Sequence, residues 1–224
     1  MTQMIFHLVR HGKVDSHRGD VPIADDAYID IDKTASLIAA QCEPDEVISF
    51  FATKTKRSRE TAIGLSRRIK ELLPGVTCLD LIEEYAIRNP DLYLAGHRVE
   101  MVSTGSALAA QLPNGTLTAE DAERHPFFGK FFRAPDRIEY WLNHQDPPGE
   151  NATAVARRIV SFARSLGDSH GAASARIVAV SHSPVMRAVL TEFCNLDDPG
   201  EPDWVESIDI TIQGNALNVA FRNR

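Results

Sequence analysis

The feature that most constrains this chain lies near its start. Residues 5–9 are an apolar run of strand length, and Arg10, His11 and Gly12 follow directly. Open α/β sheets gather ligands at the carboxyl ends of their strands, so we expect a guanidinium and an imidazole together at that edge. Arginine binds phosphoryl oxygens through paired charge-assisted hydrogen bonds, and neutral histidine is a nucleophile near neutral pH. The run indicates phosphoryl transfer through a phosphohistidine, although the tripeptide alone is equally compatible with a loop arginine and a packing histidine.

A second histidine ends another apolar run. Residues 177–180 lead into Ser181 and His182. Alone, His182 would be interpreted as a packing histidine at a strand end, but with His11 in the same position on another strand a shared site is the better interpretation. Ser183 and Pro184 are typical of a helix start, with the serine capping and the proline in the first turn. Backbone amides beside His182 are therefore expected to favour a bound anion.

The order of these blocks resembles the histidine phosphatase superfamily, in its phosphoglycerate-mutase-like branch. That family reads strand-Arg-His-Gly, then Ser-x-Leu-x-Arg-x-x-Gln/Glu-Thr-Ala, then Leu-x-Glu, and last Val-Ser/Ala-His-Gly. The resemblance spans nearly the whole chain and implies that His11 is the nucleophile and that Arg10, Arg57 and His182 bind the phosphoryl oxygens. The other branch carries His-Asp at the second histidine, and the Ser183 of this chain argues against it.

Several positions depart from the family pattern. Lys13 stands where the family prefers Glu or Gln, Val14 where a hydroxyl is common, Thr55 where leucine is usual, and Ser183 where glycine is usual. Thr53 keeps a hydroxyl at the family's serine position. These departures remove no core catalytic group, but they weaken any transfer of substrate identity. The residues expected on the substrate side of the site are Gly12, Lys13, Thr53 and Ser183.

Helical geometry chooses between two arginines after Thr53. Residues two apart on a helix point to nearly opposite sides, so only one of Arg57 and Arg59 can enter the pocket. The family register Arg-x-x-Glu-Thr-Ala selects Arg57 and leaves Arg59 as a solvated charge.

Phosphoryl transfer also needs a proton donor for the departing oxygen, and carboxylates are the usual choice. The family's Leu-x-Glu fits residues 81–83, which makes Glu83 the predicted donor. Strand alternation should turn the neighbouring Glu84 to the other side, which favours Glu83. Glu84 remains the alternative, because strand ends are located only approximately from sequence.

Strand-like and helix-like segments alternate along the chain, which predicts a three-layer α/β/α fold of the phosphoglycerate-mutase-like kind. The predicted strands are residues 4–9, 46–51, 76–82, 176–181, 207–212 and 216–221, and the predicted helices are 32–41, 56–72, 151–166 and 184–194. The sequence at 213–215 is typical of a hairpin turn, so the sheet should be mixed, though mostly parallel. We expect one histidine-phosphatase domain over residues 1–224.

A partly helical insertion over the active site is expected at about residues 85–149. Its aromatic side chains repeat at helical spacing and are expected to pack the insertion onto the core: Phe127, Phe128, Phe131 and Phe132. It ends at residues 149–151, which resemble the family's Gly-Glu-Ser segment before a helix containing Arg157. Candidates for a second anionic group of the substrate, each more typical of a surface position, are His97, His125, Arg88, Arg98, Arg124, Arg133 and Arg137.

Composition limits the partners. The 224 residues carry a formal net charge of −7, whereas nucleic acids and anionic membranes need a basic face. With no signal-type segment and no apolar run of spanning length, a cytoplasmic location is expected. Cys42, Cys78 and Cys194 have no metal-ligand spacing and are expected to be reduced, buried and structural.

Together these patterns predict a metal-independent phosphatase that needs no cofactor and hydrolyses a small phosphomonoester. A phosphoglycerate-type mutase would use the same site, but the mutases' Glu-Arg-His-Tyr-Gly is absent at residues 83–87. A noncatalytic phospholigand sensor or scaffold, and a phosphoprotein phosphatase, are further alternatives. The sequence does not determine the physiological substrate, the pathway or the oligomeric state.

Overall fold

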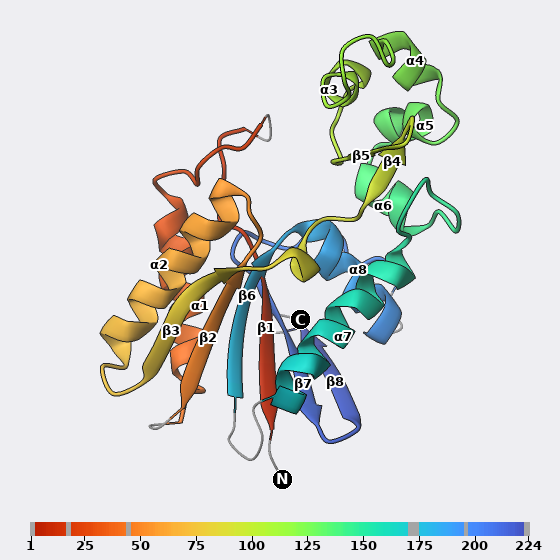
Figure 1. The fold of residues 1–224 in the computed structure, drawn as a ribbon. Helices are drawn as coiled ribbons and strands as arrows, with labels where there is room; N and C mark the ends of the chain where they lie inside the picture. The colour runs from red at the N-terminus through yellow and green to blue at the C-terminus, as the bar shows by residue number, and fades with distance from the viewer. Residues whose placement is uncertain (1–2, 17–18, 44–45, 170–174, 195–196, 222–224) are drawn as a thin grey trace.

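A six-stranded sheet in the order β3-β2-β6-β1-β7-β8 forms the centre of the computed structural model, which describes residues 3–16, 19–43, 46–169, 175–194 and 197–221 (Figure 1). The strands are β1 (Met4–Arg10), β2 (Val47–Ala52), β3 (Thr77–Glu83), β6 (Ala175–Ser181), β7 (Ser207–Gln213) and β8 (Ala216–Phe221). Strands β3, β2, β6 and β1 are parallel, and β7 runs antiparallel to both β1 and β8. The predicted mixed, mostly parallel sheet is confirmed.

Two pairs of helices cover the two faces of the sheet. The helices α1 (Ala27–Ala39) and α2 (Lys56–Leu72) lie on one face, and α7 (Ala152–Ser169) and α8 (Ser183–Cys194) on the other (Figure 1). Side chains of a strand point alternately to the two faces, so Val9 packs with α1 and α2 while Leu8 packs with α7 and α8. Both are fully buried, and the three-layer prediction is confirmed.

The predicted boundaries differ most at the first helix. It begins at Ala27, five residues before the predicted start at 32, because Ala27 and Ile31 are buried against α2. Helix α8 begins at Ser183, one residue early, and the Ser183 hydroxyl donates to Glu201 Oε2 at 2.6 Å rather than capping the helix. At the hairpin between β7 and β8, the predicted turn is present at Gly214 and Asn215.

The insertion rises beyond the carboxyl ends of the strands as a separate lobe (Figure 1). Its elements are a 3₁₀ turn (Tyr85–Ile87), β4 (Leu92–Leu94), β5 (His97–Val99), α3 (Gly105–Ala109), α4 (Ala119–Arg124), α5 (Phe128–Arg133) and α6 (Arg137–Leu142). Phe127, Phe128 and Phe131 are at most 4% exposed and join the apolar cluster under α7 and α8, with Phe132 partly buried beside them. Their ring contacts are with one another and with Tyr140 and His144, so they form the core of the lobe itself rather than packing it onto the body.

Buried ion pairs fix the root of this lobe. Asp91 accepts hydrogen bonds from Arg88 and from Arg98, and its backbone N–H donates to Glu150 Oε2 at 2.8 Å. Burial alone would raise the pKa of Asp91, but the two arginines lower it to about 2. Glu150 also pairs with Arg158 at 2.9 Å, so the arginine that partners this segment is Arg158.

Arg157, which the family resemblance placed in the helix after residues 149–151, does not pair with Glu150. Its side chain is 71% exposed, and its Nε lies 3.5 Å from Glu192 Oε1.

The cysteines differ in part from expectation. Cys42, Cys78 and Cys194 are unpaired, as predicted, but only partly buried. Burial nevertheless raises the pKa of Cys42 to about 11 and raises the pKa of the other two thiols. Separately, none of the helices in the described ranges is long and apolar enough to cross a membrane.

Candidate active site

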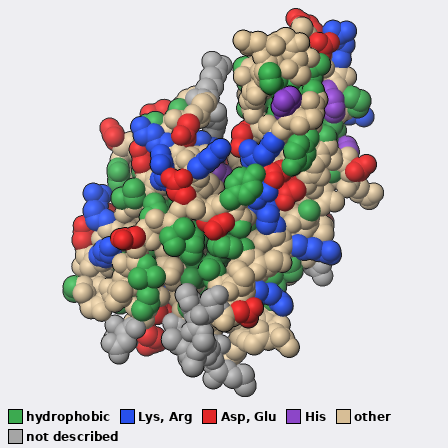
Figure 2. All heavy atoms as spheres, in the orientation of Figure 1, with side chains coloured by type: hydrophobic (Ala, Val, Ile, Leu, Met, Phe, Trp, Pro, Cys, Tyr) green, Lys and Arg blue, Asp and Glu red, His purple; other side chains and the backbone are tan. Residues whose placement is uncertain are grey.

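The two histidines of the sequence motifs lie together at the carboxyl edge of the sheet. Strands β1 and β6 are neighbours, and the His11 N–H donates to the Ser181 carbonyl at 3.0 Å. This pairing brings the rings of His11 and His182 to 5.3 Å between centroids. The two side chains are 4% and 3% exposed, so both imidazoles are buried. Figure 2 shows a hollow beside this edge, between the lobe and the body.

The contacts of His11 define which ring nitrogen can attack. Arg57 Nε donates to His11 Nε2 at 3.2 Å, so Nε2 presents its lone pair. Nδ1 lies 2.9 Å from the Gly12 carbonyl oxygen and must therefore carry the proton. The neutral imidazole is thus held with its nucleophilic nitrogen facing the cation of Arg57.

The first turn of α2 fixes both partners of this contact. Thr61 Oγ1 accepts from the Gly12 N–H at 2.8 Å and donates to the Arg57 carbonyl at 2.7 Å. A Cβ on Gly12 would lie 3.2–3.3 Å from Ala27, Ile23 and Thr61, so close packing favours glycine here. Gly12 was expected on the substrate side of the site, and its N–H donates to Thr61.

Arg10 lies next to His11 and is covered by residues 201–204 of the loop between α8 and β7. Its Nη2 is 2.6 Å from Glu201 Oε1, its Nη1 donates to the Pro202 carbonyl, and its guanidinium lies 3.7 Å from the Trp204 ring centroid. Arg10 is 6% exposed, and burial lowers its pKa, although an arginine keeps its charge. Within the described part of the chain, no group accepts a hydrogen bond from Arg10 Nε. A buried charged donor without an acceptor is costly and is typical of a site that receives an anion.

His182 faces a hydroxyl at the end of β2. Thr53 Oγ1 lies 3.1 Å from His182 Nε2 and 3.1 Å from Thr55 Oγ1. The His182 carbonyl accepts from the Val185 and Met186 amides, so this residue sits at the amino end of α8. The helix dipole there favours negative charge beside His182.

The two candidate proton donors have different surroundings. Glu83 is half exposed, and its carboxylate accepts from Arg59 Nη1 at 2.9 Å, on the side of α2 opposite Arg57. The Glu84 backbone N–H donates to the Ala52 carbonyl at 2.9 Å, next to Thr53, and its carboxylate accepts from the Ala86 amide at 2.7 Å. The predicted donor Glu83 therefore belongs to a surface ion pair, whereas Glu84 lies at the strand edge near the site.

Lys13 also belongs to a surface ion pair. Its Nζ lies 2.5 Å from Asp26 Oδ2, with both side chains about half exposed. This pair raises the pKa of Lys13. The structure thus brings Arg10, His11, Arg57, Thr53 and His182 together and leaves Lys13 at the rim.

Sequence reasoning missed the loop between α8 and β7. Trp204 lies 5.5 Å from the His11 ring and covers Arg10, and Glu201 lies against both Arg10 and Ser183. Val205 is fully buried with a φ of 56°, a conformation that β-branched residues rarely adopt. The one available signal was a tryptophan among carboxylates in a loop.

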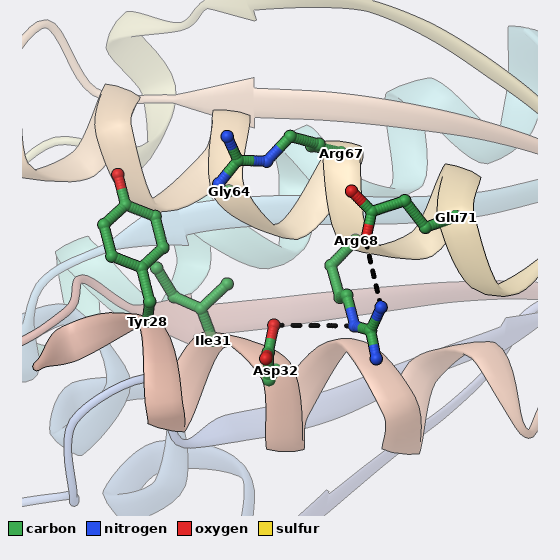
Figure 3. Close-up of a pocket in the computed structure, with 7 residues that line it drawn as sticks. All are labelled: Tyr28, Ile31, Asp32, Gly64, Arg67, Arg68 and Glu71. Carbon is green, nitrogen blue, oxygen red and sulfur yellow. Dashed lines mark hydrogen bonds and ion pairs between the residues drawn. The ribbon is translucent and has the colours of Figure 1, made fainter.

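A groove elsewhere on the body has no histidine pair. It lies between α1 and α2 and is lined by Tyr28, Ile31, Asp32, Gly64, Arg67, Arg68 and Glu71 (Figure 3). Arg68 pairs with Glu71 at 2.9 Å and Asp32 at 3.5 Å, and its Nε, like that of Arg10, has no hydrogen-bond acceptor in the described chain. What distinguishes Arg10 is its place beside His11 and His182. Across the described ranges, no three His, Cys, Asp or Glu side chains form a group able to hold a metal ion.

The comparisons with known proteins agree with this arrangement. Residues 116–205 match the model of the histidine phosphatase superfamily (branch 1), a segment that contains His182. No curated protein matches the chain in sequence. Similar solved structures include a mycobacterial glucosyl-3-phosphoglycerate phosphatase at 14% identity, TM-score 0.59, covering 98% of this chain and 97% of that one.

Two further structures share the fold along the whole chain. A phosphoglycerate mutase from Bacillus anthracis matches at 12% identity and TM-score 0.61, covering 99% of this chain and 93% of that one. A phosphoserine phosphatase mutant from Entamoeba histolytica matches at 13% identity and TM-score 0.56, covering 100% and 98%. The family match is to the histidine phosphatase superfamily (branch 1) over residues 116–205, and the fold of the whole chain is the one that these phosphatases and this mutase share.

Proposed function

We propose that this protein is a metal-independent phosphatase that hydrolyses a small phosphomonoester through a phosphohistidine on His11. The observation that carries the proposal is the pairing of His11 Nε2 with Arg57 Nε at 3.2 Å, beside the buried Arg10 Nε that has no acceptor in the described chain. An attacking lone pair and donors for phosphoryl oxygens lie together at one edge of the sheet.

The proposed reaction has two steps. His11 Nε2 attacks phosphorus while the bond to the alcohol oxygen breaks, and that oxygen takes a proton from a carboxylic acid. Water then attacks the phosphohistidine and gives a proton back to the carboxylate, and inorganic phosphate leaves. Arg10, Arg57 and His182 stabilise the charge on the equatorial oxygens in both steps.

For the proton donor the geometry favours Glu84 over Glu83. An exposed carboxylate that pairs with Arg59 is a poor acid for a buried site, whereas Glu84 leaves the strand beside Ala52 and Thr53. We expect Glu84→Gln to give a burst of nitrophenol from p-nitrophenyl phosphate and then slow turnover, because nitrophenolate leaves without protonation but water still needs a base. Glu83→Gln is the matched control; a burst there and none in Glu84→Gln would restore the sequence-based choice.

The decisive experiment traps the intermediate. Brief incubation with a ³²P-labelled phosphomonoester and denaturation should leave acid-labile, base-stable label on the wild-type chain and none on His11→Ala. Phosphate release should continue in excess chelator, since the mechanism assigns the phosphoryl charge to arginine and histidine. A loss of activity that Mg²⁺ or Zn²⁺ restores would contradict it.

The choice of substrates starts from the family. Its members act on phosphomonoesters, and the matched structures include enzymes named for glucosyl-3-phosphoglycerate and phosphoserine. A panel of phosphorylated metabolites, scored for phosphate release, identifies the preferred ester. Assaying phosphoryl migration on phosphoglycerates in parallel tests the mutase alternative, because a mutase protects its phosphohistidine from water.

A further inference from the structure

Carboxylates surround the cations of the proposed site on two sides. On the Arg10 side, Glu201 Oε1 lies 2.6 Å from Nη2. On the Arg57 side, the charges of Asp20 and Glu100 raise the pKa of Arg57 against the lowering by burial; Asp20 accepts from the Lys56 amide at 2.7 Å and Glu100 from Arg98 at 2.9 Å. A site that binds only an anion does not need carboxylates beside its cations. These carboxylates therefore bear on the charge of the part of the substrate that is attached to the phosphoryl group.

Glu201 is fixed in place rather than loosely positioned. Its Oε2 accepts from Ser183 Oγ at 2.6 Å and lies 3.5 Å from Arg187 Nη1. Arg187 is 1% exposed and is itself held by Asp136 and Asp198. The Glu201 side chain nevertheless remains 50% exposed, so a ligand can reach it.

Two cations of the insertion are already paired with carboxylates. Arg88 and Arg98 both donate to Asp91, and Arg98 also donates to Glu100. Two of the arginines that the sequence suggested for a second anionic group are therefore neutralised. Beside His11 itself, the cations are Arg57 and Arg10, whose buried Nε has no acceptor in the described chain.

We propose that Glu201 is a specificity-determining residue, which selects phosphomonoesters that carry a positively charged ammonium group near the phosphoryl group and disfavours those with a second anion. The inference rests on the proposed function. With the phosphoryl group on Arg10, an ammonium group a few bonds away pairs with the Glu201 carboxylate. A carboxylate of the substrate in the same place is repelled by Glu201.

The test uses three two-carbon esters that differ only in the terminal group: phosphoethanolamine, 2-hydroxyethyl phosphate and phosphoglycolate. For the wild type we expect kcat/KM to fall in that order. Glu201→Gln should lower kcat/KM for phosphoethanolamine about tenfold, the size of a charge-assisted hydrogen bond, and raise it several-fold for phosphoglycolate. The hydroxyethyl ester should change little.

Glu71→Gln, in the groove between α1 and α2, is the matched control and should leave all three values unchanged (Figure 3). An equal rise for all three esters in Glu201→Gln would mean that Glu201 merely competes with the phosphoryl group for Arg10. An equal fall would mean that it only positions Arg10. Either result overturns the proposal.

Wild-type measurements keep the test valid if the variant does not fold. Added NaCl should shrink the preference for phosphoethanolamine over phosphoglycolate, because ionic strength screens a partly exposed charge. A preference that is absent, or that salt does not affect, contradicts the inference. Turnover of p-nitrophenyl phosphate distinguishes a failure of the proposed function from a failure of the role proposed for Glu201. No turnover of any phosphomonoester refutes the proposed function, whereas an active enzyme without charge preference refutes only the role of Glu201.

Discussion

Two buried histidines, one in β1 and one directly after it, have different surroundings. His7 is fully buried; its Nδ1 lies 2.6 Å from Asp209 Oδ1 and its Nε2 accepts from Arg176 Nη1 at 2.8 Å. His11, four residues on, has the same tautomer and likewise turns Nε2 toward an arginine. Burial and tautomer therefore do not distinguish a structural histidine from a catalytic one.

The difference lies in how the neighbouring arginines are neutralised. Arg176 is 2% exposed and donates through Nε to Glu46 at 2.9 Å, through Nη1 to His7 and through Nη2 to the Gln41 carbonyl. Arg10 keeps a buried Nε for which the described chain supplies no acceptor. A closed network stabilises the fold, whereas a network with an open donor can receive a substrate.

The largest effect expected from this comparison is on rate. His11→Ala should reduce turnover of p-nitrophenyl phosphate more than about a hundredfold, because it removes the nucleophile. The same substitution at His7 should leave kcat per folded molecule within about threefold. Activity of His11→Ala above a hundredth of wild type would break the contrast, provided that circular dichroism shows both variants folded.

Stability should show the reverse order. His7→Ala removes the partner shared by the buried Arg176 and the partly buried Asp209, while Arg176 keeps Glu46 and the Gln41 carbonyl. Leaving polar groups without their partner typically costs about 1–3 kcal/mol in the free energy of unfolding. Guanidinium denaturation of both variants measures this loss. A smaller loss for His7→Ala than for His11→Ala would show that the His7 network is not the stabilising one.

The root of the insertion is a second closed network, and its effect depends on pH. The pKa of Asp91 is lowered to about 2 from 3.8, so ionised Asp91 contributes about 2 kcal/mol at neutral pH. Because the folded pKa is the lower one, this contribution is present above about pH 4 and is lost as the pH falls toward 2. Asp91→Asn should be destabilised at pH 7, and the difference from wild type should disappear at low pH. A difference that does not vary between pH 7 and pH 3 would contradict this assignment.

The smallest effect is expected at the surface. Glu83 and Arg59 are 50% and 44% exposed, and such pairs contribute at most about 1 kcal/mol. Arg59→Gln should therefore change the unfolding midpoint little and should not alter kcat. A strong loss of turnover in Arg59→Gln would connect this pair to the site and favour Glu83 as the proton donor.

The layered fold and most of the helices and strands could be predicted from the sequence alone. Apolar runs of strand length and helices with a buried stripe depend on local periodicity, which the chain carries in each segment. The predicted helix at 56–72 matches α2 for this reason, whereas the start of α1 was missed because Ala27 and Ile31 are helical through burial against α2.

Which charged side chains form ion pairs follows from the tertiary structure. Arg10 and Glu201 lie far apart in sequence, and no local pattern relates them, because the turn of the chain between α8 and β7 sets the contact. A shift of the strand register by one residue would exchange the surroundings of Glu83 and Glu84. The alternation of side chains in the sequence locates the end of the strand only to within one residue. Periodicity is a local property, and sequence can encode it directly; electrostatic partners are set by packing over long distances, so they appear only in the folded chain.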